Sequence, residues 1–274
     1  MSATRGWCLR LKAQPDLRVD FGGVQPARLA GMAADEVARL QVRHGNEMLA
    51  LGELFDVAEV SADAPALRLE GELSRFDGIG QGMDGGVLVV DGAVGDRLGL
   101  ALRAGEIRVQ GDAGQLAGCE MAGGRIEVAG DVGDFAAGAL PGSMDGMRGG
   151  TLVVRGKAGA RGGDRMRRGT LIIHGEAGDF LASRMVAGTI AVAGRVGAHC
   201  GYGMRRGTLV FAGPQPPAPP TFVATRQDIV VFWTLLRRSL AYHGGPFATL
   251  PACAPRRLVG DLAADGKGEW LLPD

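Results

Sequence analysis

The chain has few aromatic residues and no excess of charge of either sign. Aromatic side chains make up 5% of its 274 residues, and 30 Lys+Arg balance 30 Asp+Glu, so the formal net charge is zero. A neutral chain lacks the overall positive charge typical of proteins that bind nucleic acid or anionic membranes. We therefore expect neither nucleic acid nor a membrane among its partners.

The four cysteines have no metal-ligand spacing. Cys8, Cys119, Cys200 and Cys253 are scattered and form no CxxC pair, so the sequence predicts no zinc or iron–sulfur site. Free thiols fit a reducing compartment. The N-terminus has no apolar signal core, and no apolar run approaches the roughly 20 residues of a membrane-spanning helix. We expect a cytoplasmic chain that binds no metal or other cofactor itself.

What the sequence has in excess is glycine, and the glycines recur at a fixed interval. Of the 47 glycines, seven precede a short apolar run, and we call these the leading glycines: Gly86, Gly105, Gly124, Gly150, Gly169, Gly188 and Gly207. They are 19 residues apart, except for 26 between Gly124 and Gly150. Apolar residues occupy the second and fourth positions after each leading glycine. A strict short period with one strand per repeat is typical of solenoids.

A column of methionines accompanies the repeat, three residues before each leading glycine. Its members are Met83, Leu102, Met121, Met147, Met166, Met185 and Met204. Methionine is flexible and fills irregular gaps, so a buried methionine column explains how the core manages with few aromatic rings. A methionine-rich metal surface is the alternative. The column keeps register with the other apolar columns, which favours the core.

These patterns predict an all-β solenoid: a right-handed parallel β-helix of about eight rungs over residues 46–213. Met48–Val57 and Pro65–Gly71 are interpreted as two early rungs. Residues 1–45 are expected to form an N-terminal cap, with a strand over Trp7–Lys12 and a helix over Ala33–Val42. A solenoid has two open ends, and both need such covers.

The last part of the chain, residues 214–274, is predicted to be a proline linker, a helix and an irregular tail. Prolines crowd the segment up to Pro220, and a capping-box pattern at Thr225 opens an apolar helix over about Arg226–Tyr242. The helix is apolar on nearly all sides, so we expect it to be buried against the solenoid or a partner. The final stretch, from Leu258, shows no clear pattern.

No catalytic constellation is evident. The four histidines are separate from one another, and His174, just before a corner glycine, is expected to point to solvent. Asp96, Asp134 and Asp179 share one column but form no adjacent pair, so they are interpreted as caps of turn amides. A polysaccharide-acting β-helix enzyme would need clustered carboxylates. No catalytic residue is proposed, and whether the chain is itself an enzyme stays open.

Arginines gather before successive leading glycines and form the first candidate site. They are Arg148, Arg165, Arg167, Arg168, Arg184, Arg205 and Arg206. Stacked on neighbouring rungs, like charges repel one another, which favours a role in binding an acidic partner protein or an anionic ligand. The alternative is pairing within the chain, to Asp164 or Glu176 for example.

The seven extra residues of the longer repeat form the second candidate site. They lie within Gly138–Met144, and Leu140, Pro141 and Ser143 are the candidate contact residues. A long loop on a rigid scaffold often carries function. The loop is interpreted either as a contact for a ligand or a neighbouring subunit, or as a tolerated insertion.

Several segments resemble a known family. They include Leu51–Val57, Ala139–Gly150, Gly163–Thr170, Gly201–Gly207 and the tail Val259–Glu269. The rungs resemble the β-helical domain of glutamate synthase. Over roughly residues 26–274 the chain is more similar to the C subunits of formylmethanofuran dehydrogenase and of its bacterial counterpart, the formyltransferase/hydrolase complex.

The resemblance implies a non-catalytic scaffold subunit of a cytoplasmic one-carbon enzyme complex. In the bacterial complex, formyl passes from formyl-tetrahydromethanopterin to a methanofuran-type carrier and is released as formate, during formaldehyde oxidation in methylotrophs. The resemblance places this chemistry in partner subunits, one amidohydrolase-like with metal ions and one a formyltransferase, so a hetero-oligomer is expected. The alternatives are the C subunit of the tungsten or molybdenum formylmethanofuran dehydrogenase, and a binding module for the carrier's polyglutamate tail. Arginine far outnumbers lysine in the chain, 27 against 3, which favours the bacterial complex.

Overall fold

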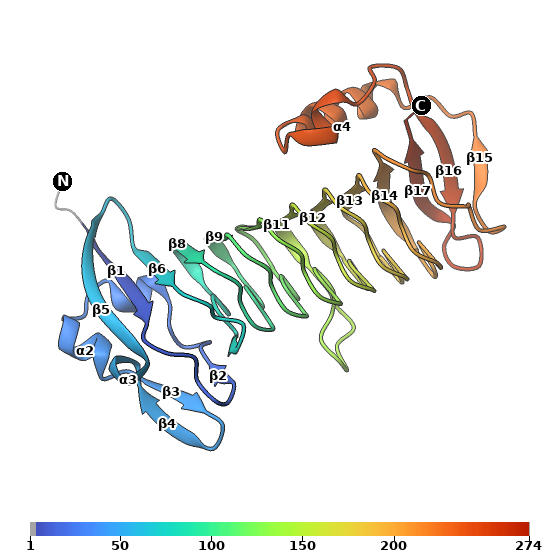
Figure 1. Ribbon diagram of the computed structural model, residues 1–274. Coiled ribbons are helices and arrows are strands. Elements are labelled where there is room, and N and C mark those ends of the chain that lie inside the picture. The colour runs from blue at the N-terminus through green and yellow to red at the C-terminus, as the bar shows by residue number, and fades with distance from the viewer. Residues whose placement is uncertain (1–3, 274) are drawn as a thin grey trace.

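Each apolar run of the glycine repeat forms one strand of a large sheet in the computed structural model, which describes residues 4–273 (Figure 1). Strands β8 to β14 follow one another along the chain and along the sheet, each paired in parallel with the next. They span Asp84–Asp91 (β8), Ala104–Val109 (β9), Arg125–Val128 (β10), Arg148–Val154 (β11), Arg168–Ile173 (β12), Thr189–Val192 (β13) and Arg206–Phe211 (β14). Equivalent positions are paired, as Leu88 is with Ile107, so the predicted columns stack.

A second row of contacts runs along the repeats, away from the large sheet. Single parallel bridges connect Leu73, Val94, Ala113, Val132, Ala158, Ala177 and Val196 in turn. At the start of each strand the chain turns at the leading glycine. Gly150 has a φ of +82°, and a Cβ there would lie 2.7 Å from the carbonyl oxygens of Gly123 and Gly124. No other residue type fits this corner without strain.

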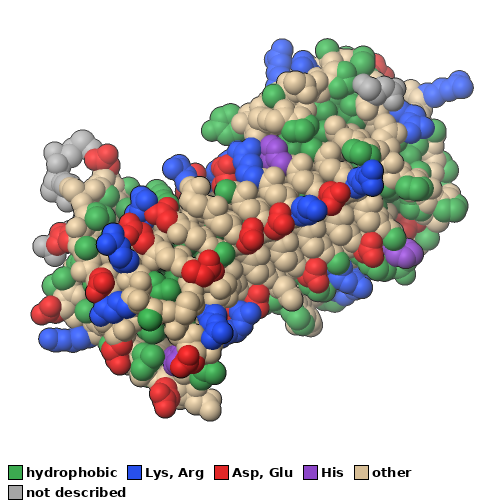
Figure 2. Space-filling view, viewed as in Figure 1, with side chains coloured by type: hydrophobic (Ala, Val, Ile, Leu, Met, Phe, Trp, Pro, Cys, Tyr) green, Lys and Arg blue, Asp and Glu red, His purple; other side chains and the backbone are tan. Residues whose placement is uncertain are grey.

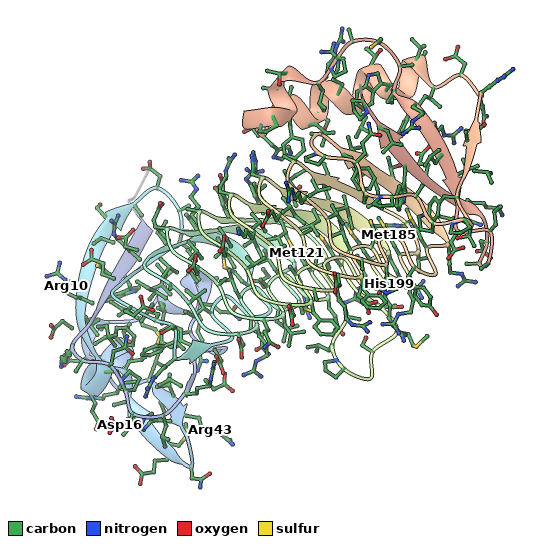
Figure 3. The ribbon with its side chains drawn as sticks, turned by 45° about the vertical axis from the view of Figure 1, so that its right-hand side comes forward. Arg10, Asp16, Arg43, Met121, Met185 and His199 are labelled. Atoms are coloured by element: carbon green, nitrogen blue, oxygen red, sulfur yellow. The ribbon has the colours of Figure 1, made fainter. Side chains whose placement is uncertain are left out.

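The apolar columns between these rows form the core. All seven members of the methionine column are fully buried, and Figure 3 shows Met121 and Met185 among the stacked repeats. The column two residues after each leading glycine is fully buried as well. The prediction of a methionine core is therefore confirmed. Burial of this kind contributes roughly 1.5–3 kcal/mol per large apolar side chain.

At the N-terminal end, one of the two predicted early rungs is wrong. Strand β6 (Ala66–Glu70) pairs in parallel with β8, as predicted, but its other neighbour is β1 (Thr4–Leu11). Met48–Val57 instead covers parts of β4 (Glu47–Ala50), α3 (Leu51–Leu54) and β5 (Phe55–Ala62). Because β1 already fills the place beside β6, β5 adds to the far side of β1 as an antiparallel strand.

The remaining N-terminal elements form a small second sheet and two short helices. The sheet has the order β4–β3–β2–β7. The elements are β2 (Val19–Asp20), α1 (Pro26–Leu29), α2 (Ala34–Ala38), β3 (Gln41–His44) and β7 (Phe76–Asp77). The helix expected over Ala33–Val42 is shorter, because β3 begins at Gln41 and pairs with β4. Phe21, Phe55 and Phe76 pack here with ring centroids 5.4–5.8 Å apart.

The C-terminal tail, which showed no clear pattern in the sequence, extends the large sheet. Strand β17 (Lys267–Leu272) pairs in parallel with β14. Two antiparallel strands follow, β16 (Arg256–Gly260) and β15 (Val223–Thr225). Within residues 4–273 the large sheet thus has 13 strands, most of them parallel. The tail covers the end of the repeats at which β14 lies (Figure 1).

Helix α4 (Val230–Ala241) and the 3-10 turn η1 (Gly245–Thr249) lie over the outer face of the sheet (Figure 1). Trp233 and Phe247 pack there against outward side chains of the strands, such as Ile172. The predicted capping box is wrong: Thr225 belongs to β15, and the Asp228 carboxylate accepts from the Val230 amide at 2.8 Å.

The helix packs against the repeats, as expected, but with one face only. Trp233 is fully buried, but Val231 is 76% exposed and Leu235 62% exposed. The helix lies flat on the sheet, so only one of its faces is covered.

Candidate functional site

Five of the seven predicted arginines line one surface groove. Its volume is about 570 Å³, and its floor includes Val186 and Ala187. The arginines are Arg148, Arg167, Arg168, Arg205 and Arg206. They lie together because each is at or just before the start of a strand in the parallel part of the sheet. Arg148 is directly opposite Arg168. We call this site the basic groove.

The groove arginines differ in whether an acidic side chain neutralises them. Arg167 pairs with Asp145, and Arg205 Nε lies 3.4 Å from the Asp265 carboxylate. Arg148, Arg168 and Arg206 are exposed, and no acidic side chain of residues 4–273 pairs with them. The next strand adds another cation, because Lys267 is opposite Arg206. The groove therefore presents unneutralised positive charge to solvent.

Arg165 and Arg184 are not part of this groove, so the expectation that the seven arginines form a single site is wrong. Both lie at another corner of the repeat, where the chain adopts a left-handed conformation. Arg184 Nη2 donates to both carboxylate oxygens of Asp164, at 2.8 and 2.9 Å, and Arg165 Nε lies 3.8 Å from the same carboxylate. The alternative interpretation, pairing within the chain to Asp164, therefore holds for these two. Glu176 instead pairs with Lys157.

The insertion loop shares a surface pocket with that arginine pair. The pocket, of about 240 Å³, is lined by Leu140, Pro141 and Ser143 of the loop together with Asp164, Arg165 and Arg184. Met144, at the end of the predicted insertion, is 69% exposed. The loop projects from the side of the molecule (Figure 1). Its place leaves it accessible to a neighbouring protein, and the role of its residues as contacts stays a prediction.

A column of side chains at the left-handed corner was missed by sequence reasoning. Its members, one from each repeat, are Arg97, Leu116, Phe135, Arg161, Phe180 and His199, all with φ between +58° and +64°. The guanidinium of Arg161 lies 4.7 Å from the Phe180 ring centroid. The Phe180 and His199 rings stack at 4.7 Å. The same 19-residue spacing could have revealed this column, but non-glycine residues are not expected at φ > 0.

The aspartate column caps turns, as predicted. Asp96, Asp134 and Asp179 each accept a hydrogen bond from a backbone amide of the following repeat, at 2.7–2.9 Å. Asp112 and Asp131 do the same one corner away. These carboxylates tie neighbouring repeats together.

His174 does not point to solvent, contrary to expectation, because the C-terminal segment covers it. Its ring packs edge-on against Phe247 and lies 3.0 Å from an Arg155 nitrogen. Burial, and then the positive charge of Arg155, lowers the pKa of His174 to about 4. His243 lies nearby, and burial lowers its pKa as well.

Charged side chains on the face seen in Figure 2 gather in rows along the repeats, separated by bands of backbone and uncharged polar side chains. Within residues 4–273, no group of three or more His, Cys, Asp or Glu side chains is placed to hold a metal ion. No helix in the described part of the chain has the length and hydropathy to cross a membrane.

Comparison with known proteins gives relatives at two levels of coverage. No family model matches the chain. It is 44% identical over 90 residues, 33% of each chain, to the C subunit of the formyltransferase/hydrolase complex Fhc of Methylorubrum extorquens. It is 36% identical over 94 residues to the C subunit of the molybdenum-containing formylmethanofuran dehydrogenase 1 of Methanothermobacter marburgensis, covering 34% of this chain and 24% of the relative. The matches thus span only a quarter to a third of these relatives.

A solved structure matches nearly the whole chain. The X-ray structure of the formyltransferase/hydrolase complex (FhcABCD) from Methylorubrum extorquens, in complex with methylofuran, contains a chain of similar fold. The TM-score is 0.90 and the identity 41%, and the match covers 97% of this chain and 99% of that one.

This chain belongs to the C-subunit family. The family includes the C subunits of formylmethanofuran dehydrogenases and of the formyltransferase/hydrolase complex. Because the structural match is nearly complete, the C-subunit fold includes the N-terminal and C-terminal segments described here as well as the repeats.

Proposed function

We propose that this chain is a non-catalytic scaffold subunit of a formyltransferase/hydrolase complex of the FhcABCD kind. The proposal rests on the match to a chain of that complex over 97% of the length at 41% identity. Formyl would pass from formyl-tetrahydromethanopterin to a methanofuran-type carrier and leave as formate. This chemistry would lie in two partner subunits, a formyltransferase and an amidohydrolase-like subunit with its own metal ions. In this role the chain would be part of a hetero-oligomeric complex in the cytoplasm. The higher identity to the Fhc relative than to the dehydrogenase subunits favours this complex.

The architecture proposed for this role is a right-handed parallel β-helix. Two rows of parallel contacts recur from repeat to repeat, one in the large sheet and one at the isolated bridges, which supports stacked coils. Residues 1–45 and 214–274 would cover the two ends. Such a coil is stiff, because each repeat is hydrogen-bonded to both neighbours. It suits a frame that holds larger subunits in a fixed arrangement.

The basic groove is the surface proposed to hold an acidic partner subunit. The observation that carries this is the set of three exposed arginines with no acidic partner among residues 4–273: Arg148, Arg168 and Arg206. Guanidinium groups form strong two-pronged hydrogen bonds with carboxylates. A partner segment with carboxylates at the spacing of the repeats would neutralise them. The insertion loop residues Leu140, Pro141 and Ser143 would supply a second contact on another side.

Co-purification tests the role of the groove. The tagged chain is co-expressed with the formyltransferase and amidohydrolase-like subunits from the same organism. The double variant Arg168→Glu/Arg206→Glu should recover much less of both partners, because the charge reversal creates repulsion at the interface. The control Arg39→Glu/Arg238→Glu changes the same net charge at exposed sites elsewhere and should leave recovery unchanged. Equal recovery with both double variants would rule out the groove as the docking surface.

A second function for the groove is binding of an anionic carrier tail. The matched complex contains methylofuran, and an open groove lined by arginines also suits a polycarboxylate chain. Titration of the purified subunit with oligoglutamate distinguishes the two. Salt-sensitive binding of oligoglutamate that is lost in Arg168→Glu/Arg206→Glu favours binding of the carrier tail. If oligoglutamate does not bind even at low salt, docking of a partner protein is the function that remains.

A further inference from the structure

The corner column of cationic and aromatic side chains ends in an open pocket. The column passes from Phe135 through Arg161 and Phe180 to His199, which is labelled in Figure 3. The next repeat does not continue it, because the chain leaves the sheet as the proline-rich segment. A pocket of about 220 Å³ lies at this point, with His199, Tyr202, Pro219 and Phe222 in its walls. We call it the terminal pocket.

The pocket has aromatic walls and a buried acid. Tyr202 is 61% exposed and packs edge-on against Phe180, at 6.1 Å. Asp261 lines the pocket and is only 6% exposed. No cationic side chain among residues 4–273 pairs with Asp261; its carboxylate accepts from the amides of Gly203, at 3.1 Å, and Ala263, at 3.0 Å. Burial would raise the pKa of Asp261, but hydrogen bonds from Thr221 and the backbone lower it, so the carboxylate is negatively charged.

A second buried group beside the pocket lacks a partner. Trp270 is fully buried, and its indole N–H has no acceptor in the described part of the chain. It lies behind Gly201, which lines the pocket: a Cβ on Gly201 would be 3.1 Å from Trp270 Nε1. The indole N–H therefore lies directly behind one wall of the pocket.

We propose that the terminal pocket receives an arginine side chain from a partner protein. A planar guanidinium stacks on aromatic faces and is attracted by a carboxylate that lacks a counter-charge. The chain already uses this arrangement internally, with Arg161 between Phe135 and Phe180. The pocket is smaller than the roughly 300 Å³ at which small-molecule sites begin, and buried arginines are common anchors of protein interfaces.

The proposal goes beyond the scaffold role and stands apart from it. The terminal pocket shares no lining residue with the basic groove. Its occupant is a cation, whereas the groove attracts anions. A failure of groove binding would leave the pocket untouched, and the reverse also holds.

The indole N–H signals of the full chain provide the test. The chain has three tryptophans, and the N–H groups of Trp7 and Trp233 are hydrogen-bonded to the carbonyls of Leu29 and Pro251. The probes are the acetylated methylamides of arginine, lysine and tyrosine, followed by proton–nitrogen NMR. The arginine probe should shift the Trp270 signal in a saturable way and leave Trp7 and Trp233 in place. A saturable shift that is as strong with the lysine or the tyrosine probe would overturn the proposal, as would no shift.

Two variants sharpen the result. Tyr202→Ala removes an exposed wall and should weaken arginine-probe binding by roughly two- to fivefold. The matched control is Tyr242→Ala. Tyr242 is the other tyrosine, directly follows α4 and is 83% exposed. This variant should bind the arginine probe as the wild type does. Asp261→Asn should reduce binding further, and unchanged Trp7 and Trp233 signals show that it is folded. Equal binding by Tyr202→Ala and the wild type would also contradict the pocket's role.

Discussion

Two adjacent glycines, Gly85 and Gly86, show how the repeat depends on single residues. Gly86 is a leading glycine with a φ of +82°, and a Cβ there would lie 2.5 Å from the carbonyl oxygen of Pro65. Gly85 has no positive φ, and a Cβ on it would meet nothing within 4 Å. The leading glycine is thus required by the close approach of two repeats, whereas its neighbour is not.

Gly86→Ala should destabilise the protein by about 1 kcal/mol or more, because the new methyl group both clashes and strains the backbone. Gly85→Ala should change the free energy of unfolding by less than about 0.5 kcal/mol. Urea unfolding of the two variants beside the wild type provides the comparison. If both substitutions cost the same, the corner geometry described here is wrong.

At the scale of elements, the C-terminal helix is held on the sheet by a polar contact as well as an apolar one. Arg155, directly after β11, donates to the His243 carbonyl at 2.7 Å and lies beside His174. Glu127 accepts from Arg155 and Arg125. His174 packs against Phe247 of η1. Protonating His174 would place a second cation beside Arg155 in a half-buried site, which costs free energy.

This contact makes the docking of the helix sensitive to acid. The pKa of His174 is about 4 in the folded chain, below its ordinary value of 6.5, so the unfolded chain takes up the proton first. Stability should therefore be fully present above about pH 6.5 and fall as the pH drops towards 4. His174→Gln should flatten this part of the pH profile. Urea unfolding between about pH 7 and about pH 4.5 measures it, and an unchanged slope in His174→Gln would exclude this histidine as the cause.

How much of the element structure the sequence predicts depends on its repetition. The repeat allowed the strands and the methionine core to be predicted correctly. The columns that contain Leu152 and Met147 each occur in seven copies, so a pattern that is ambiguous in one copy becomes clear in the set. The ends of the chain occur once. Val42 was predicted to be helical and lies in a strand, and Met48–Val57 was predicted to be a rung, because local patterns there do not reveal the tertiary pairing with β4 and β1.

The candidate site was predictable only in part for the same reason. Sequence spacing brought Arg148, Arg167 and Arg205 together correctly. It failed for Arg165 and Arg184, because a turn within each repeat directs them to another corner. The terminal pocket could not be predicted, since it depends on where the tail returns after the proline segment.

For the whole molecule, these features describe a stiff, elongated frame with separate surfaces. The basic groove attracts acid, the terminal pocket attracts a cation, and the insertion loop projects from the side of the repeats. At another corner, Arg184 forms an ion pair with the buried Asp164. The match to a chain of the FhcABCD complex is in accord with such a frame.

The most direct test of the scaffold role is the mass of the assembled complex, measured by light scattering with and without this chain. The formyltransferase and amidohydrolase-like subunits, co-expressed with it, should form one large species that carries the formyl-transfer activity. Without the chain they should separate into smaller species, and the chain alone should be inactive. If the partner subunits still formed one complex of their combined mass, with full activity, in the absence of this chain, the scaffold role would be contradicted. Formyl transfer by the isolated chain would contradict it as well.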